Sequence, residues 1–107
     1  MKHPVTAAVA ACLAMTLVPA AAQDRPLLGI VSISATEANN VRYIAGATAA
    51  AEKAGWEVSV IDAAGSADQA NSAIQNFAGR GATAIIDMVF PYSSIGAGLA
   101  AARDADI

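Results

Sequence analysis

The stretch LLGIVSI at residues 27–33 decides the fold class of this chain. It is short, apolar and rich in branched residues, which is typical of a β-strand buried on both faces. Residues 34–38 are polar and predict a loop. Residues 39–54 then place apolar side chains on one face of a helix, which is expected to contain Val41, Ile44, Ala45, Thr48 and Ala51. A buried strand followed by an amphipathic helix indicates an α/β protein.

The same alternation continues to the end of the sequence. Residues 56–62 predict a second strand, and a turn with Ser66 or Asp68 as N-cap leads into a second helix. The buried face of that helix is expected to contain Ala70, Ala73, Ile74, Phe77 and Ala78. Residues 82–89 predict a third strand, and Ser93 or Ser94 is expected to cap a third helix that runs to about Arg103. The order β-α-β-α-β-α predicts a three-layer α/β fold with a parallel sheet and right-handed crossovers.

The length of 107 residues allows one domain. Three strands are few, and the third predicted helix ends where a fourth strand should begin. We therefore expect residues 23–107 to be the first part of a larger lobe, and its sheet to be incomplete. Small domains bury little surface, so we also expect this part to be aggregation-prone or only partly structured on its own.

The first 22 residues are predicted to be a cleavable export signal. Lys2 and His3 form a weakly positive start, residues 7–18 are apolar or small, and small residues before Gln23 allow cleavage after Ala22. The apolar stretch is short for a membrane span. The predicted location of the mature protein is the periplasm. The alternatives are a buried or uncleaved N-terminal helix and a lipid-bearing Cys12.

Composition excludes several classes of function. The chain is 56% hydrophobic and 14% charged, but charged or turn-forming residues interrupt every long apolar run after residue 23. The formal net charge is −3, and loss of Lys2 with the signal makes it one unit more negative. We therefore expect no nucleic-acid partner and no stable membrane insertion after cleavage. Cys12 and His3, the one cysteine and the one histidine, fall in the signal, which excludes His- or Cys-based catalysis and the usual zinc sites from the mature part.

Two loops should meet where a ligand would bind. In parallel sheets, ligands bind beyond the carboxyl ends of the strands, and uncharged hydrogen-bonding side chains there suit a polyhydroxylated solute. The candidate ligand-binding residues are Ser34, Thr36, Glu37, Asn39, Asn40, Asp87, Met88 and Phe90. The alternative is that these residues only form turns and caps. Gly96 and Gly98 match a dinucleotide-binding pattern, but they are expected inside the third helix, where they allow close packing on the sheet.

Several segments resemble the type 1 periplasmic solute-binding proteins of ABC transporters, the relatives of ribose- and galactose-binding proteins. These segments are residues 27–34, GATAAAEKAGWEV at 46–58, 61–63, GRGATAII at 79–86 and GLAAARDADI at 98–107. The resemblance implies two lobes joined by a hinge, which close on the ligand and then dock on a membrane permease. In sugar-binding members the loop after the first strand offers an asparagine and two aromatic residues. The matching positions here are Glu37, Asn39 and Asn40, and the third-strand position falls on Met88 beside Asp87.

The matching loop therefore has no aromatic residue, and Phe90 or Tyr92 could supply the missing apolar face. The expected function is the substrate-binding component of an ABC transporter. Such a component is not an enzyme, has no cofactor or metal, and binds a small polar solute, most plausibly a sugar, for delivery to a permease. The alternatives are a periplasmic sensor that presents the bound solute to a chemoreceptor or sensor kinase, and an exported flavodoxin-like enzyme.

Overall fold

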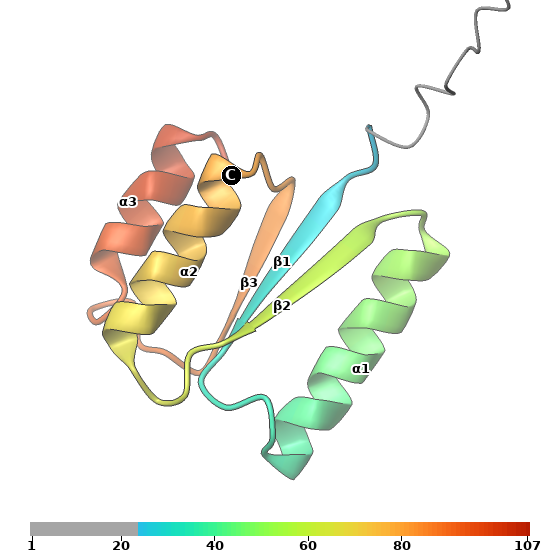
Figure 1. Cartoon of the computed structure of the whole chain (residues 1–107), viewed down its shortest axis with the longest axis horizontal. Helices are drawn as coiled ribbons and strands as arrows, with labels where there is room; N and C mark the ends of the chain where they lie inside the picture. Colours follow the sequence, from blue (N-terminus) through green and yellow to red (C-terminus); the bar gives the residue numbers. More distant parts are fainter. Residues whose placement is uncertain (1–23) are drawn as a thin grey trace, which may run out of the picture.

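The computed structural model describes residues 24–107, so the predicted export signal and Cys12 lie outside the described residues. Strands and helices alternate along the chain. The elements are β1 (Leu27–Ser32), α1 (Ala38–Lys53), β2 (Glu57–Asp62), α2 (Ala67–Gly79), β3 (Ala84–Met88) and α3 (Gly96–Asp104). The strands form one sheet in the order β2-β1-β3, and β1 pairs in parallel with both neighbours (Figure 1). The predicted α/β fold with a parallel sheet is confirmed.

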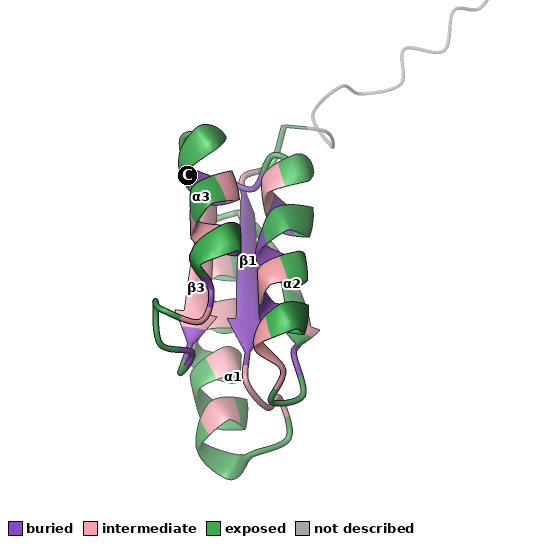
Figure 2. Ribbon diagram, turned by 90° about the vertical axis from the view of Figure 1, so that its left-hand side faces the viewer, coloured by how far each residue is buried: buried purple, intermediate pink, exposed green. Residues whose placement is uncertain are grey.

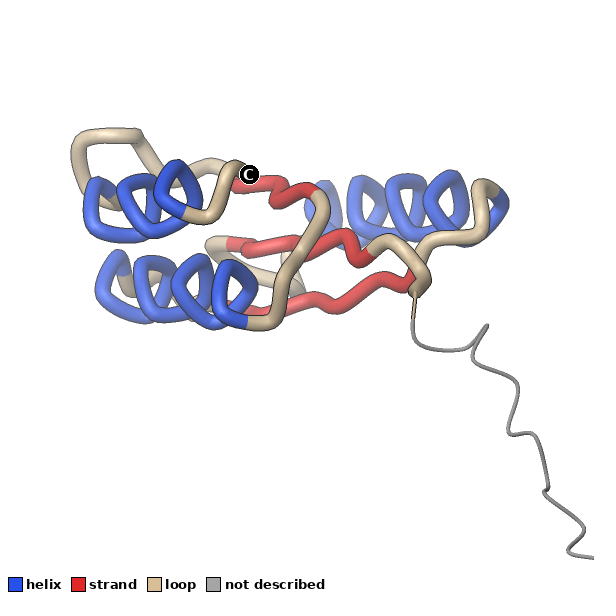
Figure 3. Tube along the Cα trace, turned by 90° about the horizontal axis from the view of Figure 1, so that it is seen from above, coloured by secondary structure: helices blue, strands red, loops and turns tan. Residues whose placement is uncertain are grey.

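The sheet lies between two unequal layers of helix. Figure 3 shows α1 on one side of the sheet and the pair α2 and α3 on the other. The side chains form two clusters that match these layers, because alternate residues of a strand point to opposite faces. Leu28 and Ile30 of β1 join the cluster under α1, whereas Leu27 and Val31 join the cluster under α2 and α3. Of the helices in residues 24–107, none is long and apolar enough to cross a bilayer.

β1 is the centre of the molecule. All six of its residues are buried, and Ile30, Val31 and Ser32 have no exposed surface (Figure 2). The prediction of a strand buried on both faces is confirmed. β2 is an edge strand: none of its residues is fully buried, and Val58 and Ile61 pack against the two clusters on opposite faces of the sheet.

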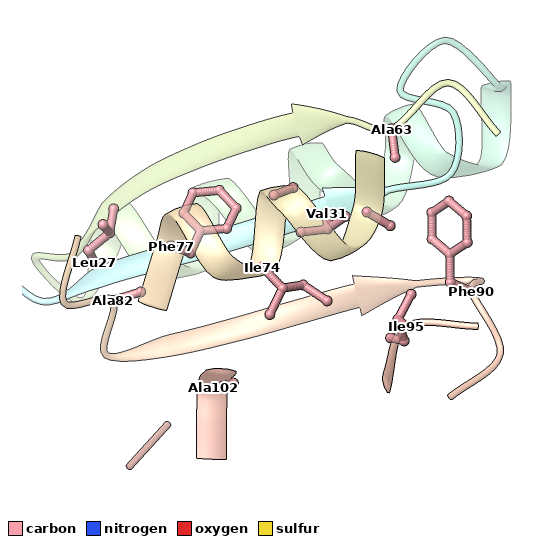
Figure 4. Packing of buried hydrophobic residues seen from close by; sticks show 11 residues of the cluster. Leu27, Val31, Ala63, Ile74, Phe77, Ala82, Phe90, Ile95 and Ala102 are labelled. Carbon is pink, nitrogen blue, oxygen red and sulfur yellow. The ribbon is translucent and has the colours of Figure 1, made fainter. Parts of the chain in front are cut away.

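The larger cluster is built around Phe77 of α2 (Figure 4). The predicted helix face is confirmed for Ala70, Ala73, Ile74 and Phe77, which are all buried. Phe77 lies directly over Gly29 of β1, where a Cβ atom would stand 2.6 Å from two carbons of the ring. The absence of a side chain at Gly29 therefore lets α2 pack close to the sheet.

The end of α1 follows the expected pattern, but its buried face does not. Gly55 follows the helix with a φ of +85°, the left-handed conformation that glycine adopts without a steric cost. The predicted face was wrong in part: Val41 is 47% exposed and Ala45 is also exposed. The helix instead packs on the sheet through Ile44, Ala47 and Ala51. Val41 lies in the first turns of α1, which extend past the strand ends (Figure 1).

The predicted N-cap residue of α2 is confirmed, and the predicted N-cap residue of α3 is not. Ser66 is the N-cap of α2, and its side chain accepts a hydrogen bond from the Gln69 backbone N–H at 3.2 Å. The N-cap position of α3 is Ile95, without a side-chain cap, so the prediction of Ser93 or Ser94 was wrong. The Ser94 hydroxyl donates to the Pro91 carbonyl instead, at 2.8 Å.

An asparagine of the neighbouring helix holds the first turn of α3. The Asn71 amide oxygen accepts from the Gly98 backbone N–H at 2.8 Å, and its Nδ2 donates to the Ser94 carbonyl at 3.0 Å. A Cβ atom at Gly98 would stand 2.9 Å from the Ile74 side chain. Gly98 thus allows close packing of α3 on α2, and the expected packing of this glycine on the sheet is corrected.

Candidate ligand-binding site

The reversal of strand order between β1 and β3 opens a crevice at the carboxyl edge of the sheet. The chain leaves β1 toward α1 on one face and leaves β3 toward α3 on the other face. The two strand ends still touch, because the Ile33 backbone N–H donates to the Met88 carbonyl at 3.3 Å. Adjacent strands whose connections diverge to opposite faces are where open α/β sheets bind ligands.

A pocket of about 270 Å³ lies beside this point, on the α1 face. It is lined by Asn40, Tyr43, Ile86, Asp87, Met88 and Val89. The first turns of α1 and the end of β3 supply these residues, so segments more than forty positions apart in sequence share one wall. The pocket is large enough for a small solute of one ring, since pockets for larger ligands start near 300 Å³. Of the residues predicted for binding, Asn40, Asp87 and Met88 come together here.

The loop after β1 is organised by its own polar groups. The hydroxyls of Ser34 and Thr36 lie 3.2 Å apart, and Asn40 Nδ2 donates to the Ser34 carbonyl at 2.8 Å. This bond uses the amide nitrogen of Asn40 and leaves its carbonyl oxygen as an acceptor. Glu37 is the N-cap of α1 and makes no side-chain cap bond, so the first N–H groups of α1 also remain available. Asn39 is exposed in the same turn and does not line the pocket.

The two β3 residues of the site face opposite ways. Ile86 and Met88 belong to the cluster under α1, so the intervening Asp87 side chain lies on the α2 and α3 face. Its Oδ1 atom is buried without a hydrogen-bond partner among the described residues. Burial raises the pKa of Asp87, and a hydrogen bond from the Phe90 backbone partly opposes this rise. Asp87 also lines a second pocket, of about 280 Å³, between β3 and α3.

The aromatic residues do not lie where the sequence suggested. Phe90 is 6% exposed and packs in the larger core cluster, so its ring does not face the pocket (Figure 4). Tyr92 is 75% exposed but does not line the pocket. Tyr43, which was not predicted, lines it and is 66% exposed. The available signal was its spacing, because Tyr43 follows Asn40 by three residues and shares its helix face.

The charges at the carboxyl edge of the sheet are mainly negative. Carboxylates at the carboxyl edge of the sheet come from the ends of β2 and β3 and from the starts of α1 and α2: Glu37, Asp62, Asp68 and Asp87. Arg42 is the basic residue of the first turns of α1, whereas Lys53 and Arg103 lie in the last turns of their helices, at the other edge. Within residues 24–107 no group of three metal-binding side chains is placed to hold an ion.

Two larger hollows lie away from this crevice. One, of about 430 Å³, runs beside α2 and is lined by Ile61, Asp68, Gln69, Ser72, Ala73 and Asn76. The other, of about 490 Å³, is almost wholly apolar and lies between α1 and the start of β3, near Trp56 and Ala84. Neither lies at the reversal of strand order, so size alone does not identify the site.

A comparison of the chain with models of known protein families gives no match, and a comparison with curated proteins gives none either.

Proposed function

We propose that this chain is part of a periplasmic solute-binding protein. It binds a small polar solute of the sugar class and delivers it to the membrane permease of an ABC transporter. The observation that carries the proposal is the crevice between β1 and β3, where the start of α1 and the end of β3 share a pocket. The resemblance of residues 27–107 to the ribose- and galactose-binding relatives supports the same reading.

The chemistry of the pocket fits a neutral polyhydroxylated solute. The free carbonyl oxygen of Asn40 accepts a hydrogen bond, and the N–H groups at the start of α1 donate them. A hydroxyl group can do both, so a polyol satisfies both sides of such a site. Export by the signal in residues 1–22 would place the site in the periplasm, and closure of a second lobe over the crevice would give the permease a closed form to recognise.

Binding is tested by thermal unfolding of the full chain with sugars, polyols and amino acids at millimolar concentration. A solute at 100 times its Kd stabilises the folded state by about 2.7 kcal/mol. For a domain of this size that raises Tm by roughly 10–20 °C. No rise with any sugar or polyol would contradict the proposal.

Matched variants locate the binding. Asn40→Ala is expected to lower the ligand-induced rise in Tm by about half, because loss of one hydrogen bond weakens binding about tenfold. Asn76→Ala is the control, since Asn76 is an exposed asparagine on α2, on the opposite face of the sheet. Equal ligand-induced shifts in both variants would place the binding site elsewhere.

A further inference from the structure

The outer edge of β2 presents backbone groups that no neighbouring strand meets. β2 lies at one end of the strand order β2-β1-β3, so it is paired on one side. On that side the Glu57 N–H donates to the carbonyl of Pro26, just before β1, at 2.8 Å. Alternate residues of a strand bond to a given neighbour, so the N–H and C=O groups of Val58, Val60 and Asp62 point to the open side.

Nothing in β2 blocks the addition of another strand. Natural sheets protect their open edges with proline, lysine or bulges. The sequence of β2, EVSVID, contains neither proline nor lysine, its pairing with β1 is continuous, and Val60 is 39% exposed. A right-handed connection after α3 would add a strand beyond β3, because α3 lies on the same face of the sheet as α2 (Figure 3). The edge of β2 therefore stays open to a partner.

A hollow beside this edge is placed to take side chains of an added strand. It has a volume of about 430 Å³ and lies between β2 and α2. One ionisable residue, one apolar residue of each element and three uncharged polar residues of α2 line it: Asp68, Ile61, Ala73, Gln69, Ser72 and Asn76. When an extended peptide joins a sheet edge, backbone bonds supply affinity and such hollows select alternate side chains.

The charges favour a basic partner over a second copy of this chain. In the antiparallel register that pairs two whole β2 strands, Glu57 of each copy would lie opposite Asp62 of the other, and like charges in this position are destabilising. Asp68 places a further carboxylate in the hollow, in the first turn of α2. Arg80 follows the last turn of α2, where its Nη1 donates to Ser59 Oγ at 3.3 Å. The end of the hollow near Asp68 is thus the end that suits a cation.

We propose that the edge of β2 docks an extended segment of a partner protein, which adds a fourth strand and places a basic side chain beside Asp68. Parallel sheets often carry an antiparallel edge strand, and in that direction the basic residue lies at the amino end of the segment. Its alternate side chains are short and polar in the hollow, and apolar where they cover Val60. The proposal does not rest on the proposed function, because no residue of β2 lines the pocket at the crevice.

The probe is the peptide acetyl-KVTVTV-amide, and acetyl-EVTVTV-amide is its charge-reversed twin. Binding to the isotope-labelled full chain is followed by NMR titration and by amide hydrogen exchange. The lysine peptide should slow exchange at Val58, Val60 and Asp62 by at least about tenfold, and the twin should bind about fivefold more weakly. Methylation of alternate backbone nitrogens of the lysine peptide should abolish binding in one phase and be tolerated in the other, because one row of its N–H groups faces β2.

Two variants separate the charge from the backbone pairing. Asp68→Lys should reverse the preference, so that the glutamate peptide binds more tightly. Asp104→Lys is the matched control, because Asp104 is an exposed carboxylate at the end of α3 that does not line the hollow. Val60→Pro removes an outward N–H without breaking a bond to β1, and it should abolish binding of the lysine peptide.

The contradicting results are specific. Slowed exchange at residues 84–88 in place of β2 would put the peptide on the other edge of the sheet and refute the proposal. Protection of β2 that grows with protein concentration in the absence of peptide would assign the edge to a second copy. Equal binding of the two peptides to the wild type, an unchanged preference in Asp68→Lys, or no binding of either peptide at millimolar concentration would also refute it.

Discussion

Gly29→Ala should be the most damaging small substitution in the sheet. Gly29 lies in the central strand, with the Phe77 ring directly over its Cα atom. The added Cβ would stand 2.6 Å from ring atoms Cγ and Cδ2 and 2.9 Å from Cδ1. Ordinary van der Waals contact begins near 3.4 Å, so the ring must withdraw by nearly 1 Å. Phe77 has no exposed surface, and this movement therefore separates α2 from the sheet.

We expect Gly29→Ala to lower the free energy of unfolding by about 3 kcal/mol, at the upper end of the usual cost of overpacking. Domains of this size are stable by about 5–15 kcal/mol, so the loss is a large part of the total. It corresponds to a fall in Tm of roughly 12–24 °C. The assay is urea unfolding monitored by far-ultraviolet circular dichroism. Wild type and variant are compared with one shared m-value, the slope of the free energy of unfolding against urea concentration.

Two further variants identify the cause. Gly46→Ala is the matched control: Gly46 lies inside α1 with no atom near the added Cβ, so the change should stabilise the chain by about 0.5–1 kcal/mol. Phe77→Leu removes the ring, so Gly29→Ala should cost at least about 1 kcal/mol less in that background. Equal costs of Gly29→Ala in the two backgrounds, or a cost below about 0.5 kcal/mol in the wild type, would refute the reasoning.

Three other predictions concern the crevice and the helix pair beside it. Val89 has a φ of +84°, so Val89→Gly should raise the free energy of unfolding by about 1 kcal/mol, because relief of strain exceeds the added entropy of the unfolded chain. Asp87→Asn should raise Tm near pH 7. Since burial raises the pKa of Asp87 in the folded state, the wild type loses stability as pH rises from 3.8 through that raised value, and the variant should lack this loss. Asn71→Ala should cost about 1–3 kcal/mol, measured by urea unfolding, because the Gly98 N–H loses its partner.

Each of these has a distinct contradicting result. Val89→Ala should stabilise little, because alanine is also strained at positive φ; if it stabilises as much as Val89→Gly, backbone strain is not the cause. Identical pH profiles of Tm for wild type and Asp87→Asn would contradict the role of burial. Asn76→Ala changes an exposed asparagine of the same helix, so a cost equal to that of Asn71→Ala would exclude the inter-helix bonds as the explanation.

The sheet and the second helix were readable in the sequence because their signals are local. A run such as LLGIVSI is short, rich in branched residues and without a charged face, which favours a strand between two layers. In α2 the apolar spacing is strict from Ala70 to Phe77, and Ser66 carries the cap that its chemistry predicts. The alternation of strands and helices then implied parallel pairing.

The errors arose where tertiary contacts override local pattern. In α1 many residues are alanine, so the spacing of apolar residues does not determine which face meets the sheet, and Val41 was misplaced. At the start of α3, Ser93 and Ser94 were good local candidates for the cap. The bond is supplied instead by Asn71 from another helix, which local reasoning cannot foresee.

The sequence predicted that Asn40 and Met88 would lie close together, but not which other side chains line their pocket. The parallel sheet fixed where Asn40 and Met88 would meet, and their pocket is found there. Phe90 was expected at the ligand, but the turn at Val89 directs it into the core. Tyr43 was missed because an aromatic residue in the second turn of a helix usually signals packing. Which side chains face the pocket depends on the rotation of α1 and the conformation of one turn residue, and neither is encoded in a short pattern.

The order β2-β1-β3 also has a consequence for biosynthesis. β1, which lies between β2 and β3 in the sheet, is the first of the three strands to leave the ribosome. Its second partner, β3, begins only at Ala84. Until Ala84 has been made, the uncharged strand β1 has no partner on one side, and its backbone N–H and C=O groups there are unpaired. Such an unpaired strand edge promotes self-association. Nascent chains stalled before Ala84 should therefore bind chaperones more strongly than chains that include the whole of β3.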